Sequence, residues 1–354
     1  MQVGVVTTRA LGLTETGQET SWLRTLLEVC TRLQQTTTFR VYCAPEEEAL
    51  FGRWSPRVIA DEAPAGFQKW FGRNAPAWQS HLAEDRVQVA MIPFAAPYPL
   101  PCPAVRYALQ LSDWEDPQQA KAGGPVAAKR ALQKAMPQTH RVIVTSKYLQ
   151  QRLLELFEVP LEKIRVAPAG TDPLLEKEQG TFIEPPYLVC YCDAASCGTL
   201  VKMVPKIWER FQDILQSIVI TGPGAPDEPA HWGEHVLRVE SIPLLQRAGL
   251  YRAGTCFFYP HRYDGACVPS VEAMRAGVPV LSPVSGAARE LLGDAPLFYN
   301  PDSKDSLFQN LRRVFQEPAK ERARRVELGR QLARAKSWDQ CAWEVLSTFK
   351  VSGN

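Results

Sequence analysis

Two acidic residues flank a short turn in the second half of the chain. Asp264 and Glu272 stand on either side of the sequence Gly-Ala-Cys-Val-Pro (265–269). Carboxylates accept hydrogen bonds from sugar hydroxyls, and Gly265 lets the backbone approach a ligand closely. A helix expected to begin at Ser270 would direct free amide groups and its positive dipole end into the same space, where they suit phosphate oxygens. One loop that offers both kinds of group suits a sugar nucleotide.

The residues around this loop have the pattern of a strand, a helix and a second strand. The apolar run 255–259 ends at Pro260 as a buried strand would, and the run 278–281 predicts another buried strand. Between them, 270–276 predicts a helix that Gly277 ends. Such crossovers are right-handed and ligands bind at the carboxyl ends of their strands, so we expect this loop at the binding edge of a parallel sheet.

A set of residues in this stretch recurs at the spacing of a known family: Pro260, Gly265, Pro269, Glu272-Ala273-Met274 and Gly277-Val278-Pro279-Val280. The stretch resembles the donor-binding segment of the retaining glycosyltransferases with the GT-B fold, the family "glycosyl transferases, group 1". It departs from that family at Asp264, where the family has Glu, and at Ala266-Cys267, where the family has Phe-Gly. The alternative is an ordinary α/β crossover with incidental surface acids, and the number of matched positions favours the family.

The resemblance implies an α/β fold of two Rossmann-like domains facing across a cleft, with a C-terminal helix that crosses back to the N-terminal domain. A length of 354 residues suits two cores. The strand, serine, helix and strand of 141–172 match the way the family ends its first domain. The expected organisation is an acceptor-side domain 1–172, a linker 173–186, a nucleotide-sugar domain 187–336 and a final helix 337–354.

The alternation of apolar runs and amphipathic segments predicts the elements of both domains. In the first domain we expect strands at 2–7, 39–44, 87–93, 104–109, 141–145 and 164–167, with an amphipathic helix at 19–33. In the second we expect strands at 187–192, 217–222, 236–239, 255–259, 278–281 and 297–299, with helices at 303–317 and 320–336.

The resemblance also implies an activity, namely transfer of a sugar from a nucleoside diphosphate sugar to an acceptor hydroxyl with retention of anomeric configuration. A metal cofactor is not expected. By matched position, Asp264 should contact a hydroxyl of the transferred sugar and Glu272 the ribose hydroxyls. The amides of the turn should face the donor. The remaining donor-binding residues are expected to be Gly265, Ala266, Cys267, Val268, Thr221, Gly222 and Val239.

The pair of cations that the family carries after the first strand of its second domain is missing here. That place reads Cys-Asp-Ala-Ala-Ser-Cys-Gly-Thr (192–199), and the next base is Lys202. Candidates to replace the pair are Lys202, His261 and Arg262, each of which could equally be a solvated surface group. The catalytic-side His of the first domain is missing too, and Gln110 or Ser112 stands near its place.

Two functions therefore stay open. One preorganised stabiliser of a leaving group is worth about 3–4 kcal/mol, so loss of two without replacement would leave binding with little turnover. The first function is an active glycosyltransferase with relocated cations. The second is a non-catalytic glycosyltransferase-like protein that binds a nucleotide sugar, a glycan or a partner enzyme.

The first loop of the chain, 14–19, takes the place of a glycine-rich loop in the family. Glu15 and Glu19 would repel a phosphate, so Gly17 and Gln18 are expected to face the acceptor or solvent, and a plain turn between strand and helix is the alternative. The acceptor itself could be a glycan, a lipid or a small molecule.

Composition excludes several classes. A net charge of +2 gives no bulk argument for nucleic acid, no run approaches the roughly 18 apolar residues of a membrane span, and the N-terminus has the pattern of a strand and not of a signal peptide. The nine cysteines lie mostly in apolar runs, which predicts free thiols in the cytoplasm.

Two groupings could suggest a metal or a membrane surface. Cys190, Cys192 and Cys197 lack a second pair at zinc-finger spacing, and His231 and His235 lack a third ligand, so we expect no metal. The aromatic residues of 46–81 are typical of core packing between short helices. The alternatives are an acceptor-facing surface or peripheral contact with the inner face of a membrane.

Overall fold

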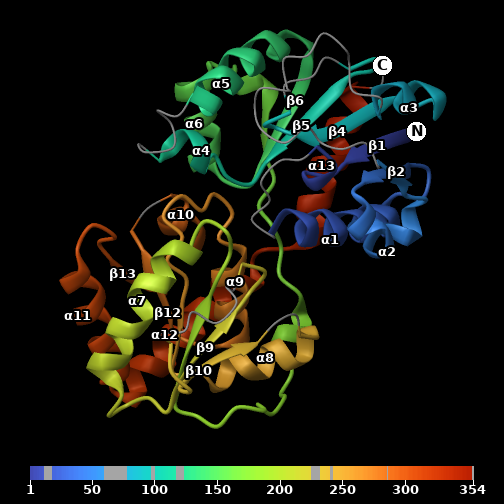
Figure 1. Ribbon diagram of the computed structural model, residues 1–354. Coiled ribbons are helices and arrows are strands. Elements are labelled where there is room, and N and C mark those ends of the chain that lie inside the picture. The colour runs from blue at the N-terminus through green and yellow to red at the C-terminus, as the bar shows by residue number, and fades with distance from the viewer. Residues whose placement is uncertain are drawn as a thin grey trace. The chain divides into compact units, whose positions relative to one another are not determined.

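The computed structural model describes residues 1–11, 18–59, 78–96, 100–116, 123–224, 232–239, 242–284 and 286–352 (Figure 1). The chain divides into two compact units. One consists of Met1–Ala169 together with Trp338–Asn354, and the other of Gly170–Ser337. Each unit contains a parallel sheet with helices, which confirms the α/β class predicted from the sequence.

The sheet of the first unit has the order β3-β2-β1-β4-β5-β6-β7 within the described residues, with parallel pairing throughout. The strand order reverses between β1 and β4, which is where ligands bind in open sheets of this kind. The bounds are β1 (Gln2–Val6), β2 (Thr38–Cys43), β3 (Arg57–Val58), β4 (Val89–Pro93), β5 (Ala104–Ala108), β6 (Thr139–Val144) and β7 (Ile164–Val166). The edge strand β3 was not predicted, because two residues are too few to show a pattern.

A serine cap starts one helix of this unit. In α6 (Lys147–Phe157), the Ser146 hydroxyl accepts a hydrogen bond from Leu149 N–H at 3.2 Å and so satisfies a free amide of the first turn. Glu158, at φ 57°, ends the helix. The other helices are α1 (Gln18–Leu33), α2 (Glu48–Phe51), α3 (Trp78–Glu84), α4 (Ser112–Glu115) and α5 (Gly123–Ala135). Single 3₁₀ turns are η1 (Arg9–Leu11), η2 (Pro45–Glu47), η3 (Gly52–Trp54), η5 (Met136–Gln138) and η6 (Leu161–Lys163).

The last helix, α13 (Trp338–Ser352), completes the first unit although it comes from the end of the chain. Arg32 on α1 forms an ion pair with Asp339, and the rings of Phe39 and Phe349 lie 6.4 Å apart. Its apolar face, with Phe349 fully buried, packs against α1 and the sheet. Burial of that face is what holds the C-terminal segment in this unit.

The second unit is built on a sheet of order β10-β9-β8-β11-β12-β13 within the described residues, again parallel throughout. This is the strand order 3-2-1-4-5-6 of a Rossmann fold, with its reversal between β8 and β11. The bounds are β8 (Tyr187–Tyr191), β9 (Ser217–Thr221), β10 (Val236–Val239), β11 (Cys256–Phe258), β12 (Val280–Pro283) and β13 (Leu297–Tyr299). The helices are α7 (Cys197–Phe211), α8 (Leu244–Ala253), α9 (Val268–Ala276), α10 (Ala288–Leu292), α11 (Lys304–Phe315) and α12 (Ala319–Arg334).

The core of the second unit forms because its strands are buried on both faces and are therefore apolar along their length. Leu188, Cys190, Ile218 and Ile220 are inaccessible to solvent, and the apolar stripe of α7 covers them. In a sheet whose two faces are both buried, the residues that can contact a ligand are those at the strand ends. The site is therefore expected in the loops that follow the strands.

The segment 173–186, predicted as a linker, belongs to the second unit. Its first turn, η7 (Pro173–Glu176), packs against α8 and α9 with Leu175 fully buried. Arg252 of α8 donates hydrogen bonds to the carbonyls of Leu175 and Lys177. The start of this segment is thus packed structure and not a free linker, because buried side-chain and main-chain contacts hold it.

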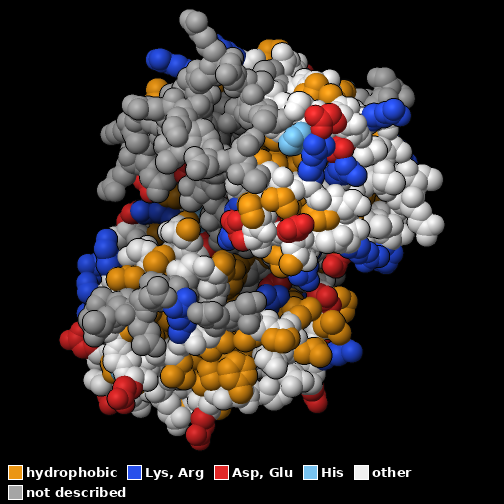
Figure 2. All heavy atoms as spheres, turned by 45° about the vertical axis from the view of Figure 1, so that its right-hand side comes forward, with side chains coloured by type: hydrophobic (Ala, Val, Ile, Leu, Met, Phe, Trp, Pro, Cys, Tyr) orange, Lys and Arg blue, Asp and Glu red, His pale blue; other side chains and the backbone are white. Residues whose placement is uncertain are grey.

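The surface on the face shown in Figure 2 has acidic and basic side chains interspersed. None of the helices in the described ranges combines the length and the apolar character needed to cross a bilayer.

Candidate functional site

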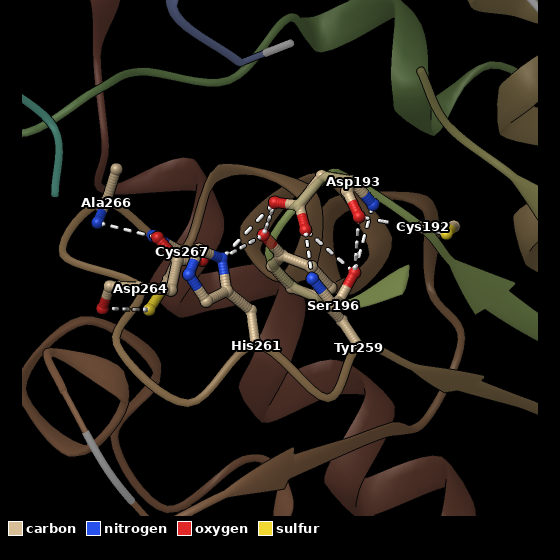
Figure 3. A network of polar contacts seen from close by, with 8 residues as sticks. All are labelled: Cys192, Asp193, Ser196, Tyr259, His261, Asp264, Ala266 and Cys267. Atoms are coloured by element: carbon tan, nitrogen blue, oxygen red, sulfur yellow. Dashed lines mark hydrogen bonds and ion pairs between the residues drawn. The ribbon is translucent and has the colours of Figure 1, made fainter. Parts of the chain in front are cut away.

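The loops after β8 and β11 meet at the strand-order reversal of the second unit. Asp193, directly after β8, is fully buried, and so is the hydroxyl-bearing Ser196 of the same loop. Tyr259 and His261 follow β11. Figure 3 shows the Tyr259 and His261 side chains pointing toward Asp193. The reversal of strand order therefore brings a buried acid and a histidine together.

The Asp193 carboxylate is the centre of this network. Its Oδ1 accepts hydrogen bonds from Ser196 N–H at 2.8 Å and from the Ser196 hydroxyl at 2.7 Å. Its Oδ2 accepts one from the Tyr259 hydroxyl at 2.5 Å and lies 3.2 Å from His261 Nδ1. Burial alone would raise the pKa of Asp193, but the bonds from His261, Tyr259 and Ser196 outweigh it and hold this pKa well below its usual range.

A hydrogen-bonded chain runs through Tyr259. Its hydroxyl is 2.7 Å from His261 Nδ1 and also donates to Asp193. With the tyrosine proton directed at the carboxylate, the tyrosine oxygen accepts from an Nδ1–H of the histidine. The acid thereby fixes the orientation of the imidazole, as second-layer carboxylates do in many sites.

Asp264 shapes the turn that precedes α9. Its Oδ1 accepts hydrogen bonds from the amides of Ala266 and Cys267, each at 2.9 Å. Cys267 then takes a left-handed conformation at φ 50° and starts the helix. The sequence predicted that these two amides face the sugar nucleotide. That prediction is corrected, because both amides donate to Asp264, the first residue of the turn.

The second oxygen of Asp264 has no such partner. Oδ2 is buried and lacks a hydrogen-bond partner among the described residues, while the residue as a whole is 6% exposed. Burial raises the pKa of Asp264, opposed by the charge of His261 and by the two amides. A buried carboxylate oxygen is normally hydrogen-bonded, so the unpartnered Oδ2 marks Asp264 as a candidate site residue.

Glu272 lies on the second turn of α9 and forms an ion pair with Arg247 of α8. Arg247 Nη2 is 3.2 Å from Glu272 Oε1. Burial raises the pKa of Glu272, Arg247 lowers it, and Asp172 raises it further. The two predicted acids thus sit in different settings, one in a turn of amides and the other beside a guanidinium.

Tyr191, the last residue of β8, connects the surroundings of the two acids. Its ring lies 5.2 Å from that of Tyr259 in an edge-to-face arrangement. Burial raises the pKa of the Tyr191 hydroxyl far above normal, and the charges of Glu272 and Asp193 raise it further. Tyr191 therefore packs on Tyr259 of the Asp193 network, and its pKa responds to the charge of Glu272 as well.

The three candidates for the missing cations lie in different surroundings. Lys202 is exposed on α7, and Arg262 forms a surface ion pair with Asp302. His261 is the exception, since it is buried within the Asp193 network. His261 is thus the predicted replacement whose contact with a buried acid, Asp193, the structure shows.

The loop after β9 packs closely on the loop after β8. Cys192 N–H donates to Thr221 O at 2.7 Å, and Gly224 N–H donates to Cys192 O at 3.0 Å. A Cβ at Gly222, whose φ is +112°, would lie 2.4 Å from Cys192 O. Thr221 and Gly222 thus hold the Asp193 loop in place, and Val239 pairs with Thr221 at the end of β10. Gly265 lies within the Asp264 turn, and Val268 is the first residue of α9.

The first unit has a pocket of its own at the reversal between β1 and β4. It has a volume of about 70 Å³ and lies among the ends of β1, β4 and β5. Glu19, Gln110, Ser112 and Trp114 are among its lining residues. Gln18 is buried at the start of α1, whereas Gly17 lies outside the described residues.

No group of three or more His, Cys, Asp or Glu side chains within the described ranges is arranged to hold a metal ion. His235 stacks on Trp208 with ring centroids 3.8 Å apart, and His231 lies outside the described residues. All nine cysteines are free.

Asp193, Ser196, Tyr259 and Arg247 were not predicted as site residues. For Asp193 a signal existed, because a lone acid directly after an apolar strand stands at the carboxyl edge of the sheet. For Arg247 there was none, since nothing in its local sequence distinguishes it from other helix surface residues.

Known proteins match parts of this sequence. Residues 192–317 match the sequence model of the family "Glycosyl transferases group 1". The chain is 33% identical over 114 residues to the O-antigen chain mannosyltransferase B of Escherichia coli, which covers 32% of this chain and 28% of that protein. It is 23% identical over 248 residues to the MMP alpha-(1->4)-mannosyltransferase of Mycolicibacterium hassiacum, covering 67% of this chain and 59% of that protein. The matched regions thus span less than two thirds of either relative.

Solved structures resemble the chain over its whole length. The glycosyltransferase WaaG, involved in lipopolysaccharide biosynthesis, superposes with a TM-score of 0.73 at 16% identity and covers 100% of both chains. Sucrose-phosphate synthase from Thermosynechococcus elongatus gives a TM-score of 0.72 at 14% identity, covering 99% of this chain and 98% of that one. The chain therefore has the GT-B fold of these structures, and its residues 192–317 match the sequence model of the glycosyl transferases group 1 family.

Proposed function

We propose that the protein transfers a sugar from a nucleoside diphosphate sugar to an acceptor hydroxyl, with retention of anomeric configuration. The observation that carries this proposal is the unpartnered Oδ2 of Asp264, buried at the strand-order reversal within the matched family segment. A fixed carboxylate oxygen of this kind accepts a sugar hydroxyl. Both curated relatives carry the name mannosyltransferase, which favours mannose as the transferred sugar.

Each part of the donor has a counterpart in the second unit. Asp264 accepts a hydroxyl of the transferred sugar, and Glu272 accepts the hydroxyls of the ribose. The first turn of α9, with its free amides and positive dipole end, suits the diphosphate. His261, fixed by Asp193, supplies a basic side chain close to Asp264.

The proposed reaction needs no protein nucleophile. The bond between the anomeric carbon and the diphosphate oxygen breaks while the acceptor oxygen bonds to the same carbon. The acceptor proton passes to the departing diphosphate. The protein contributes orientation and stabilisation of the developing charge, which is the largest contribution in many enzymes.

We assign the acceptor to the first unit, whose pocket of about 70 Å³ has room for only part of such a molecule. Glu19, Gln110 and Ser112 offer hydrogen-bonding groups, and Trp114 offers an aromatic surface. Such a combination suits a hydroxylated ligand. This supports an acceptor bound by the first unit while the donor is bound by the second.

The second candidate is a protein that binds the donor without turning it over. Asp193 occupies the loop in which the family carries its cations, while Lys202 is exposed and Arg262 forms an ion pair with Asp302. If no other cation serves the leaving diphosphate, binding would persist and transfer would be lost.

A panel of nucleoside diphosphate sugars separates the two candidates. We expect one of them, with GDP-mannose included, to raise the melting temperature and to release its nucleoside diphosphate when an acceptor is supplied. Thermal protection without release would favour the binding protein. If no member of the panel either protects or reacts, both candidates are contradicted.

Two substitutions test the assigned acids. Asp264→Asn should lower the rate about 100- to 1,000-fold, the effect of losing one preorganised polar contact to the transition state. Glu272→Gln should mainly weaken donor binding. Asp213→Asn, an exposed acid between α7 and β9 at the opposite edge of the sheet, is the matched control and should behave like the parent. Parental binding and transfer in both site variants would contradict the assignment.

The reaction is further proposed to take place in the cytoplasm. All nine cysteines are free and most are buried, and a reducing compartment keeps such thiols in that state.

A further inference from the structure

Arg247 is the basic side chain that contacts the proposed ribose-binding acid. It lies in the first turn and a half of α8, and 25 residues separate it from Glu272 in the sequence. Its guanidinium donates a hydrogen bond from Nη2 to Glu272 Oε1 at 3.2 Å. The pair forms because α8 packs against α9, and both side chains are largely buried, at 29% and 20% exposed.

Two buried polar groups, one in this pair and one near it, lack hydrogen-bond partners among the described residues. They are Arg247 Nε and the Tyr251 hydroxyl, and Tyr251 is completely buried. Buried polar groups without partners are rare in folded proteins and call for an explanation such as a ligand or a functional role. The setting of Glu272 is therefore specialised and is not an ordinary surface ion pair.

The geometry leaves part of the carboxylate free. A carboxylate offers two oxygens with about four lone-pair sites, and Arg247 uses one direction on Oε1. Among the described residues Arg247 is the hydrogen-bond partner of this carboxylate, which leaves Oε2 for the hydroxyls of a ligand. Because a guanidinium is planar and permanently charged, it fixes the carboxylate in one orientation better than an ammonium would.

We infer that Arg247 is a positioning residue of the donor site, which keeps the Glu272 carboxylate charged and oriented to accept the two neighbouring hydroxyls of a pentose. This inference rests on the proposed function, in which Glu272 contacts the ribose. Arg247 acts through Glu272 and does not itself contact the reacting atoms.

The pH dependence of binding follows from the groups around Glu272. Burial and Asp172 both raise its pKa, and Arg247 is the neighbour that lowers it. Tyr191 and Tyr251 also lie near the pair; burial raises the pKa of each hydroxyl, and the charge of Glu272 raises it further. A protonated Glu272 has lost acceptor capacity, so donor affinity is present above its pKa and is lost as the pH falls through it. Without Arg247 that midpoint should move to higher pH.

The test measures nucleotide binding by calorimetry, with UDP, GDP and ADP as probes, from mildly acidic to mildly alkaline pH. Arg247→Met should raise the Kd of the bound nucleotide about ten- to hundredfold at neutral pH, the range expected for a lost hydrogen bond to a charged group. It should also shift the binding midpoint to higher pH. Arg247→Lys, which keeps the charge, should restore the midpoint and only part of the affinity.

A matched control lies on the same helix. Arg252 donates to the carbonyls of Leu175, Lys177 and Ala276 and so has a structural role in α8. Arg252→Met should lower stability without moving the pH midpoint of binding. A shift of equal size in both variants would mean that loosening of α8 is the cause, and it would overturn the inference.

A double-mutant cycle distinguishes positioning from direct contact. If Arg247 acts through Glu272, Arg247→Met should add little to the effect of Glu272→Gln. Additive effects would mean that Arg247 contacts the nucleotide independently, and they would overturn the inference. An unchanged Kd and midpoint in Arg247→Met would overturn it as well.

An NMR titration separates this inference from the proposed function. The Glu272 carboxyl carbon, assigned by its loss in Glu272→Gln, should titrate at higher pH in Arg247→Met than in the parent. If the parent binds none of the probes, the proposed function fails while the titration still tests the pair. An unchanged titration would overturn the role of Arg247 whatever the binding result.

Discussion

Replacement of Asp193 by Asn tests the network that joins the loops after β8 and β11. The Asp193 carboxylate is completely buried and accepts hydrogen bonds from Ser196 and Tyr259, with His261 Nδ1 at 3.2 Å. Asn has nearly the same size but no charge. One of its two terminal side-chain atoms is an amide nitrogen, which cannot accept the hydrogen bonds that Ser196 and Tyr259 donate to the carboxylate.

The expected cost follows from burial. Removing one partner of a buried, hydrogen-bonded charge pair lowers the free energy of unfolding by about 3–5 kcal/mol. For a unit of this size, each kcal/mol lowers the melting temperature by about 2–4 °C. We therefore expect the second unit of Asp193→Asn to melt about 6 to 20 °C below the parent. Asp213→Asn, an exposed acid, is the control.

The pH dependence gives a second check. The pKa of Asp193 is held below its usual range, so its stabilisation is fully present above the unfolded value of about 3.9 and is lost as the pH falls through the lower folded value. The difference in melting temperature between the parent and Asp193→Asn should therefore become smaller as the pH is lowered toward about 3. Calorimetric melting at several pH values measures it. A gap below about 2 °C at neutral pH, or one that widens with acid, would refute the reasoning.

Two further substitutions test packing by chemical denaturation. Gly222→Ala places a Cβ 2.4 Å from Cys192 O at a φ of +112° and should lower the free energy of unfolding by about 2 kcal/mol or more. Gly198→Ala is its control, because a Cβ there meets nothing within 4 Å. Equal losses of stability in the two variants would contradict the close approach of the loops after β8 and β9. Phe349→Ala removes a fully buried ring of α13 and should cost the first unit about 3–5 kcal/mol. Trp343→Ala on the same helix, 50% exposed, should cost clearly less, and the reverse order would mean that the buried face has been misassigned.

Much of the fold follows from local patterns. The bounds of β10 (Val236–Val239) and β13 (Leu297–Tyr299) are those predicted, and the other predicted strands agree within about three residues at each end. Strands buried on both faces must be apolar along their length, which makes them visible as short runs. The Gly277 helix end is equally local, because its φ of 94° favours glycine.

The site follows from the sequence only in part. Motif spacing located Asp264 and Glu272, but it assigned the amides of Ala266 and Cys267 to a donor. In the structure those amides donate hydrogen bonds to Asp264 Oδ1. A hydrogen bond within a turn depends on backbone angles, and the residue types alone allow either partner.

The sequence by itself determined the alternation of strands and helices and the place of the two acids of the family segment after β11, because these depend on residues close together in the chain. Only the tertiary structure decided the partners of those acids. Asp193 meets His261 because β8 and β11 are neighbours in the sheet, and Arg247 meets Glu272 because α8 packs on α9. Burial and these partners together set the pKa of each acid, and both are properties of the packed unit.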